Sequence, residues 1–167
     1  MGRGRSRARG ALLPLAPFRS LVVNPPVLLL VDDNCDDRDL ALRALRRLDV
    51  PIEVRTARDG REALAALHVR GSPPGTEPVV PRVIFLDVCM PFVDGLEVLR
   101  AVRSAPHTRA TPVVMLSTSS SPDDVRRAYE LGANSYLVKR ADGVDSGALI
   151  AEAARYWLAL NFGPTAG

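Results

Sequence analysis

Five polar residues lie at or just after the ends of short apolar runs. Asp32 and Asp33 follow "VLLLV", Asp87 follows "VIFL", Ser117 follows "VVML" and Lys139 follows "SYLV". Three carboxylates in one cleft would repel each other and raise one another's pKa unless a cation lay among them. Oxygen ligands that leave coordination positions to water or phosphate suit Mg²⁺. If the fold brings these residues together, they predict a magnesium site.

Lys139 is the only lysine among the 22 basic residues of the chain. A chain so biased toward arginine would be expected to use arginine here too, unless this position needs an ammonium. Arginine offers a planar fork of five donors, whereas lysine offers a compact point charge on a flexible stem. Lys139 is therefore interpreted as a site residue, although most lysines are surface charges.

The segments between these residues alternate between strand-like and helix-like patterns. Apolar runs predict five strands, at 27–31, 52–57, 82–87, 111–116 and 134–139. Asp59 and Ser121 are predicted to cap the second and fourth helices. The second helix is expected within "DGREALAALHVR". The last helix is expected to run to about Leu160, with one inward face made of Ile150, Ala153, Ala154 and Trp157.

Five apolar strands that alternate with five helices predict an α/β fold with a parallel sheet covered on both faces. Right-handed crossovers leave few topologies, of which the doubly wound order 2-1-3-4-5 is the simplest. Ligands of such sheets bind outside the carboxyl ends of the strands. Taken singly, Asp32 and Asp33 could cap a helix and Ser117 could be an ordinary strand-end hydroxyl. Suitable groups on four strand ends at one edge favour a functional site.

The positive balance of +3 belongs to the start of the chain. Residues 1–26 contain no acid and five of the 22 basic residues, which are Arg3, Arg5, Arg7, Arg9 and Arg19. The remaining 17 basic residues are balanced by 19 acidic ones, so the rest of the chain has no strong positive charge. We predict that residues 27–162 form the folded domain. We predict a disordered basic arm or a misassigned start at 1–26, and a tail at 163–167.

Residues 27–160 resemble the receiver domain of two-component response regulators, the CheY-like family. The matching features are the acidic pair after the first strand, "DVCMPFVDG" after the third, and "YLVK" at the fifth. Ser117 lies 30 positions after Asp87 and Lys139 lies 52 after it, as in the family pattern. The resemblance implies that Asp87 is the phosphoacceptor, a carboxylate nucleophile that takes a phosphoryl group from a kinase phosphohistidine.

The resemblance also implies a set of ligands for Mg²⁺. Asp33, Asp87 and the backbone carbonyl of Cys89 would bind the ion directly, and Asp32 would act through bound water. The ion would neutralise the carboxylates and the charge on the transferring group. Lys139 would reach from the Asp87 carboxylate to the phosphoryl oxygens.

A switch is implied by the same resemblance. Ser117 would hydrogen-bond a phosphoryl oxygen, and Tyr136 resembles the aromatic residue that swings inward behind that hydroxyl. Thr118 is bulkier than the residue often found there and is expected to narrow access. Arg140 replaces the proline that usually follows the lysine, so the peptide bond before it is predicted to be trans.

The long loop "HVRGSPPGTEPVVP" and the ending "ARYWLALNFG" resemble the small single-domain regulators that partner phytochrome-type sensor histidine kinases. Only seven residues follow Leu160, so no DNA-binding domain is expected here. Tyr156 and Trp157 lie about 100° apart on a helix, and both cannot face the core. We therefore expect a homodimer through the last strand and helix.

The predicted function is a phosphoacceptor switch that catalyses only its own phosphotransfer and dephosphorylation. One alternative is a Mg²⁺-dependent phosphatase with an aspartate nucleophile, although such enzymes carry a second acid where this chain has Cys89. Another is a scaffold that has lost phosphorylation. Two cysteines without CxxC spacing favour a reduced cytoplasm, and no apolar run approaches the ~20 residues of a membrane span.

Overall fold

The computed structural model describes residues 25–140 and 144–163. The predicted arm at 1–26 and tail at 163–167 lie almost wholly outside the described residues, so both stay predictions. None of the helices within 25–140 and 144–163 is long and apolar enough to cross a membrane.

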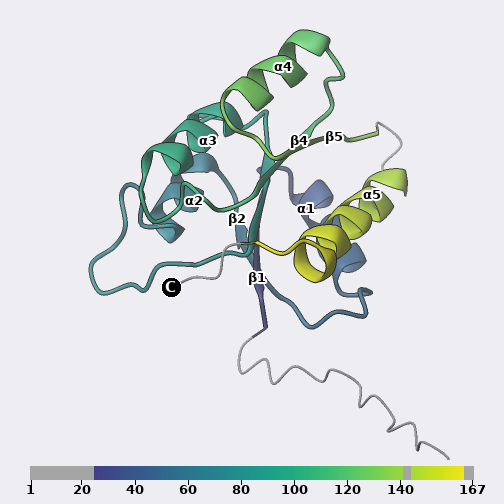
Figure 1. Ribbon diagram of the computed structural model, residues 1–167, viewed down its shortest axis with the longest axis horizontal. Coiled ribbons are helices and arrows are strands. Elements are labelled where there is room, and N and C mark those ends of the chain that lie inside the picture. The colour runs from purple at the N-terminus through teal and green to yellow at the C-terminus, as the bar shows by residue number, and fades with distance from the viewer. Residues whose placement is uncertain (1–24, 141–143, 164–167) are drawn as a thin grey trace, which may run out of the picture.

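Strands and helices alternate along the chain (Figure 1). In order they are β1 (Val27–Val31), α1 (Cys35–Leu45), β2 (Glu53–Ala57), α2 (Gly60–Ala66), β3 (Val83–Asp87), α3 (Gly95–Ser104), β4 (Val113–Ser117), α4 (Pro122–Glu130), β5 (Ser135–Val138), α5 (Val144–Arg155) and the π-helix η1 (Tyr156–Leu160). The sheet order is β2-β1-β3-β4-β5, and every pairing is parallel. This order confirms the predicted doubly wound α/β fold.

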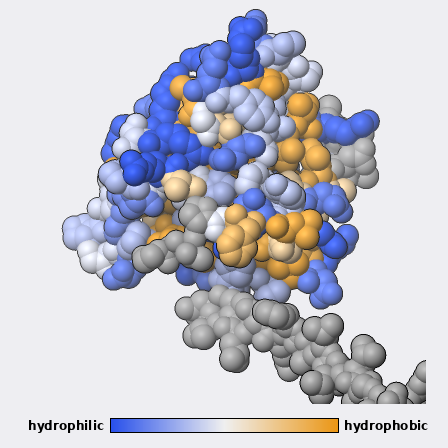
Figure 2. All heavy atoms as spheres, in the orientation of Figure 1, coloured by the Kyte–Doolittle hydropathy of each residue, from blue (hydrophilic) through white to orange (hydrophobic). Residues whose placement is uncertain are grey.

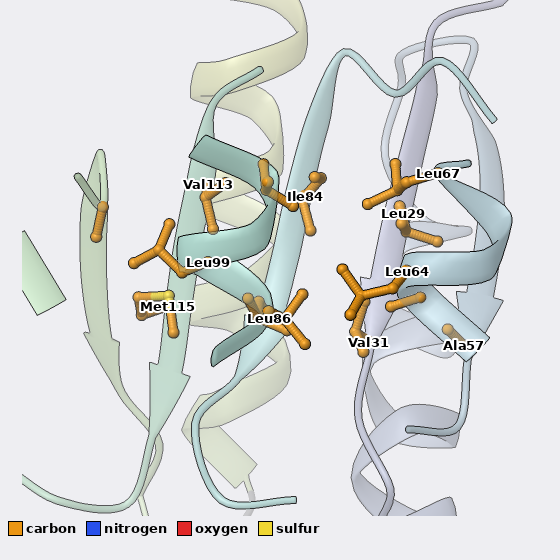
Figure 3. Close-up of a cluster of buried hydrophobic side chains, with 14 of the residues drawn as sticks. Leu29, Val31, Ala57, Leu64, Leu67, Ile84, Leu86, Leu99, Val113 and Met115 are labelled. Atoms are coloured by element: carbon orange, nitrogen blue, oxygen red, sulfur yellow. The ribbon is translucent and has the colours of Figure 1, made fainter. Parts of the chain in front are cut away.

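Both faces of the sheet are covered, which is why β1, β3 and β4 are mostly apolar and buried, whereas the edge strand β2 exposes Arg55 and Thr56. Alternate residues of β1 serve opposite faces: Leu29 and Val31 contribute to one core, whereas Leu28 and Leu30 contribute to the other. The first core lies under α2, α3 and α4 and is drawn in Figure 3. The second lies under α1 and α5, which cover the other side of the sheet (Figure 1).

One helix ends earlier than predicted, and another changes its geometry before its predicted end. Helix α2 ends at Ala66, before the end of "HVR", because His68 adopts a left-handed φ of 53°. The amides of His68 and Val69 then turn back to the carbonyls of Ala65 and Leu64, which terminates the helix as a Schellman motif. Helix α5 ends at Arg155 and continues as η1 to Leu160, so the predicted endpoint is right but the last turn is wider.

One of the two predicted caps is confirmed, and so is the predicted inward face of the last helix. The carboxylate of Asp59 accepts from the Glu62 amide at 2.8 Å, whereas Ser121 precedes α4 without a capping hydrogen bond from its side chain. Of the predicted inward face of the last helix, Ile150 and Ala154 are buried in α5, and Ala153 and Trp157, the latter in η1, pack partly buried against the same core.

Gly95 fixes the start of α3 against the end of β3. Its amide donates to the Val88 carbonyl at 3.0 Å, and a Cβ at this position would overlap the backbone carbonyl of Asp87. Glycine is therefore required by close approach of two backbones, and this contact sets the position of the residue that ends β3.

We expect Gly95→Ala to lower the free energy of unfolding by about 2 kcal/mol, because the new methyl forces β3 and α3 apart. Gly147→Ala is the matched control, since a Cβ there meets its nearest neighbour at 3.5 Å inside a helix, and alanine gains up to ~1 kcal/mol in helix propensity. Urea unfolding of both variants measures the difference. Equal stability of the two variants would contradict the packing argument.

Candidate functional site

Asp32 and Asp87 meet because β1 and β3 are neighbours in the sheet. Asp87 is the last residue of β3, and Asp32 follows the last residue of β1. Asp32 is 2% exposed and Asp87 is 4% exposed, and Ser117, at the end of β4, is 2% exposed. Three of the predicted site residues therefore lie at one edge of the sheet, shielded from water.

Lys139 is the cation of this site. It directly follows β5, and its Nζ lies 2.5 Å from Oδ1 of Asp87, 3.1 Å from Oδ2 of Asp32 and 3.0 Å from Oδ2 of Asp37. Its side chain is only 9% exposed. An ammonium has three N–H donors, and three carboxylates surround it here. A planar guanidinium, which favours flat two-point contacts with one carboxylate, does not match this arrangement.

Asp37 was missed in the sequence analysis, and so was the residue that positions it. Asn34, rather than Asp32 or Asp33, caps α1: its side chain accepts from the amides of Asp36 at 2.9 Å and Asp37 at 3.3 Å. Asparagine is a preferred N-cap, so "DNCDD" could have indicated a cap at Asn34 and an acid in the first turn. The contact of Asp37 with Lys139 joins residues 102 positions apart, so neighbouring residues in the sequence do not predict it.

Burial controls the electrostatics of the two carboxylates. Desolvation raises the pKa of Asp87 to about 6, although the hydrogen bond and charge of Lys139 lower it. Burial also raises the pKa of Asp32, again against Lys139. Desolvation lowers the pKa of Lys139, but its contacts with Asp87 and Asp32 outweigh burial, and the net pKa is raised. The pKa values of the carboxyl groups and of the ammonium are thus all raised. The carboxyl pKa values rise because one ammonium does not offset the desolvation of two carboxylates.

The predicted metal ligands differ in burial. Asp33 is exposed, whereas Asp32 and Asp87 are buried. Within the described ranges, no three Asp, Glu, His or Cys side chains form a ready metal site. The donor chemistry nevertheless fits a hard divalent cation, since two buried carboxylates have raised pKa values under a single ammonium. Asp33 and the backbone of Cys89 flank this pair in sequence.

The predicted switch residues lie next to one another. The Ser117 Oγ accepts from the amide of Ser119 at 3.1 Å, and the Tyr136 hydroxyl donates to the carbonyl of Ser119 at 3.0 Å. The Ser119 hydroxyl donates to Asp124 in α4 at 2.6 Å. Thr118 is exposed. Ser119 therefore connects the site hydroxyl to Tyr136 and to α4, a role that the sequence analysis did not assign.

The peptide bond between Lys139 and Arg140 was predicted to be trans. No cis peptide bond occurs in the described residues, so the bond to Arg140 is trans as predicted. The Arg140 amide donates to the hydroxyl of Ser146 at 3.1 Å, which ties the end of β5 to the first turn of α5.

Comparisons with known proteins agree with this geometry. A family model described as the response regulator receiver domain matches residues 28–151. The chain is 40% identical to the probable methanogenesis regulatory protein FilR2 of Methanothrix harundinacea, over 84% of this chain and 89% of that protein. It is 36% identical to response regulator Rcp1 of Synechocystis, over 81% of this chain and 91% of Rcp1.

Solved structures give the same result. The phosphorylated cyanobacterial phytochrome response regulator RcpA superposes with a TM-score of 0.77 at 36% identity, covering 84% of this chain and 99% of RcpA. The Mn²⁺-bound form of Rcp1 superposes with a TM-score of 0.76 at 34% identity, covering 84% of this chain and all of that one. The chain therefore belongs to the response regulator receiver domain family, the phosphoacceptors of two-component signalling.

Proposed function

We propose that Asp87 is the phosphoacceptor of this receiver and that a sensor histidine kinase supplies the phosphoryl group. The observation that carries the proposal is the contact between buried Asp87 and the only lysine of the chain, 2.5 Å apart at the carboxyl edge of the sheet. Similarity to Rcp1 and RcpA supports a kinase of the phytochrome type. The free, exposed cysteines, Cys35 and Cys89, support a cytoplasmic location.

In the proposed transfer, a carboxylate oxygen of Asp87 attacks the phosphorus of a phosphohistidine. The phosphorus–nitrogen bond breaks, the imidazole leaves with its electron pair, and Asp87 becomes an acyl phosphate. Lys139 moves from the carboxylate to the phosphoryl oxygens, and Ser117 donates its hydroxyl hydrogen to one of them. The Ser119 amide and carbonyl then respond, because they contact Ser117 and Tyr136.

We propose Mg²⁺ as the metal. Asp33, Asp87 and the backbone carbonyl of Cys89 would hold it directly, and Asp32 through water. When bound, Mg²⁺ would neutralise the carboxylates and the charge of the transferring group. Two buried carboxylates with raised pKa values and the Mn²⁺-bound form of Rcp1 support a divalent cation at this edge.

Neither alternative function is favoured. A phosphatase of the aspartate-nucleophile class needs a second acid two positions after the nucleophile, and this chain has Cys89 there. A silent scaffold would have no reason to keep two buried carboxylates around its only lysine, since buried charges cost stability.

A homodimer is proposed through β5 and the end of α5. Apolar residues gather over this region on the face shown in Figure 2. Tyr156 is 49% exposed, and Val138, Leu160 and Phe162 are also exposed. The Tyr156 ring meets Trp157 edge to face, with centroids 5.1 Å apart, so its position is fixed against the partly buried indole. Fixed, exposed aromatic rings are frequent anchors of interfaces.

Asp87→Asn is expected to abolish labelling by a kinase or by a small-molecule phosphoryl donor, because the amide is not a nucleophile for phosphorus. Labelling of the parent is expected to require added Mg²⁺ and to be lost with a chelator. Acid-stable and acyl-phosphate label are distinguished by hydroxylamine treatment. Asp49→Asn, which changes an exposed acid, is the control. Persistent acyl-phosphate label on the Asp87→Asn protein would refute the assignment.

Asp87→Asn is also expected to stabilise the metal-free protein at pH 7, by about 3 kcal/mol. The pKa of Asp87 is raised from 3.8 to about 6 in the folded protein. The cost of ionising this group is therefore absent below about pH 3.8, grows as the pH rises, and is complete above about pH 6. The gain from the amide should therefore shrink as the pH falls from 7 to 4. Urea unfolding at several pH values measures it. A gain that is independent of pH would contradict a raised pKa.

Tyr156→Glu is expected to weaken the homodimer at least tenfold, because it places a charge in an apolar contact. Phe92→Glu is the matched control, since Phe92 is 78% exposed and its ring lies against Arg61 of α2, a helix on the opposite face of the sheet from α5 (Figure 1). Sedimentation over a range of concentrations, with and without a phosphoryl mimic, measures the association. A parent protein that stays monomeric under all these conditions would rule out the dimer.

A further inference from the structure

We propose that Asp37 is a positioning residue, which holds the Lys139 ammonium in place while the phosphoryl group is transferred. The inference rests on the proposed role of Asp87 as phosphoacceptor. Of the three carboxylates that contact Lys139, Asp37 is the one that is proposed neither as a metal ligand nor as the phosphoacceptor.

The contact between Asp37 and Lys139 is direct. Oδ2 of Asp37 lies 3.0 Å from Nζ, within hydrogen-bond distance. The Asp37 side chain is 41% exposed, whereas the Lys139 side chain is 9% exposed. Asp37 thus lies at the rim of the site and reaches inward to an ammonium that is otherwise enclosed. A contact of this kind draws the ammonium toward α1 and limits the positions it can take.

The position of Asp37 is itself well determined. It lies in the first turn of α1, where the Asn34 side chain accepts from its amide and from that of Asp36. The backbone of Asn34 is held in turn by Asp32, whose Oδ1 accepts from the Asn34 amide at 2.9 Å. The guanidinium of Arg38 donates to the carbonyl of Asp32 at 2.8 Å. The same turn therefore positions both Asp32 and Asp37 relative to Lys139.

Transfer changes the other two contacts of the ammonium. Asp87 gives up a carboxylate oxygen to phosphorus and loses the charge that Lys139 pairs with. Asp32, whose two oxygens accept from the Asn34 amide and from Lys139, is proposed to contact metal-bound water as well. Asp37 takes part in neither event, so its ion pair with Lys139 persists while the ammonium moves from carboxylate to phosphoryl oxygen. A reacting group that is held in position loses less entropy in the transition state.

Asp36 provides a control for simple charge. It lies in the same first turn of α1 and carries the same formal charge, but it is exposed, and the ion pairs of Lys139 in the described residues do not include it. An effect of negative charge on the site or on the helix dipole would appear in both variants. An effect of positioning would appear only in the Asp37 variant.

The experiment compares Asp37→Ala with Asp36→Ala, using phosphoramidate as donor at saturating Mg²⁺. We expect the initial labelling rate to fall roughly tenfold in Asp37→Ala and to stay within about twofold of the parent in Asp36→Ala. The Kd for Mg²⁺, measured by calorimetry, should change less than about threefold in both, because Asp37 is not a ligand. Asp37→Asn, which keeps the shape of the side chain, repeats the test if alanine disturbs α1.

A double-mutant cycle separates positioning from a general loss of structure. In a Lys139→Ala background, the further change Asp37→Ala should leave the labelling rate unchanged, because the group it positions is gone. A rate in Asp37→Ala at or above that of the parent would overturn the inference, and so would an equal fall in the Lys139→Ala background. Failure of the parent itself to be labelled on Asp87 would instead overturn the proposed function.

Discussion

The site depends on one ammonium shared between two buried carboxylates. Asp32 and Asp87 are almost without contact with water, and Lys139 is the cation that compensates for them. Burial still raises the pKa of both carboxyl groups, so the site is short of positive charge. That shortage favours the binding of a divalent cation, and Lys139 is the only cation that forms an ion pair with either carboxylate in the described residues.

The rest of the fold brings these groups to one edge. Parallel pairing places the carboxyl ends of β1, β3, β4 and β5 side by side, and two apolar cores hold the sheet between its helices. Gly95 lets α3 start against the end of β3, which fixes the Asp87 backbone. The stability of the fold thus comes from apolar packing, and the unfavourable electrostatics are confined to a few residues at the edge.

The surroundings of the site suggest how a change at Asp87 reaches the surface. Ser117 is joined through Ser119 to Tyr136 on β5 and to Asp124 on α4. Each of these links is a single hydrogen bond, half-buried at Ser117 and Tyr136 and exposed at Asp124, so each can exchange when the Ser117 hydroxyl takes a new partner. Val138 at the end of β5 is exposed, as are Tyr156, Leu160 and Phe162 near the end of the last helix. Under the proposed function, a phosphoryl group on Asp87 would act on β5 through these contacts, and β5 belongs to the proposed homodimer surface.

The sequence by itself determined the strand order, the sheet edge and most of the site. Uniform apolar runs require a sheet covered on both faces, and the residues that end those runs must then meet; Asp87, Ser117 and the lone Lys139 were found in this way. Asn34 as the cap of α1 and the early end of α2 at His68 are local features that a closer reading of turn chemistry could have found. The contact of Asp37 with Lys139 and the link through Ser119 were decided only by tertiary structure. Both join residues on separate elements through side-chain directions and burial, and these depend on how helices pack on the sheet, which no spacing along the chain records.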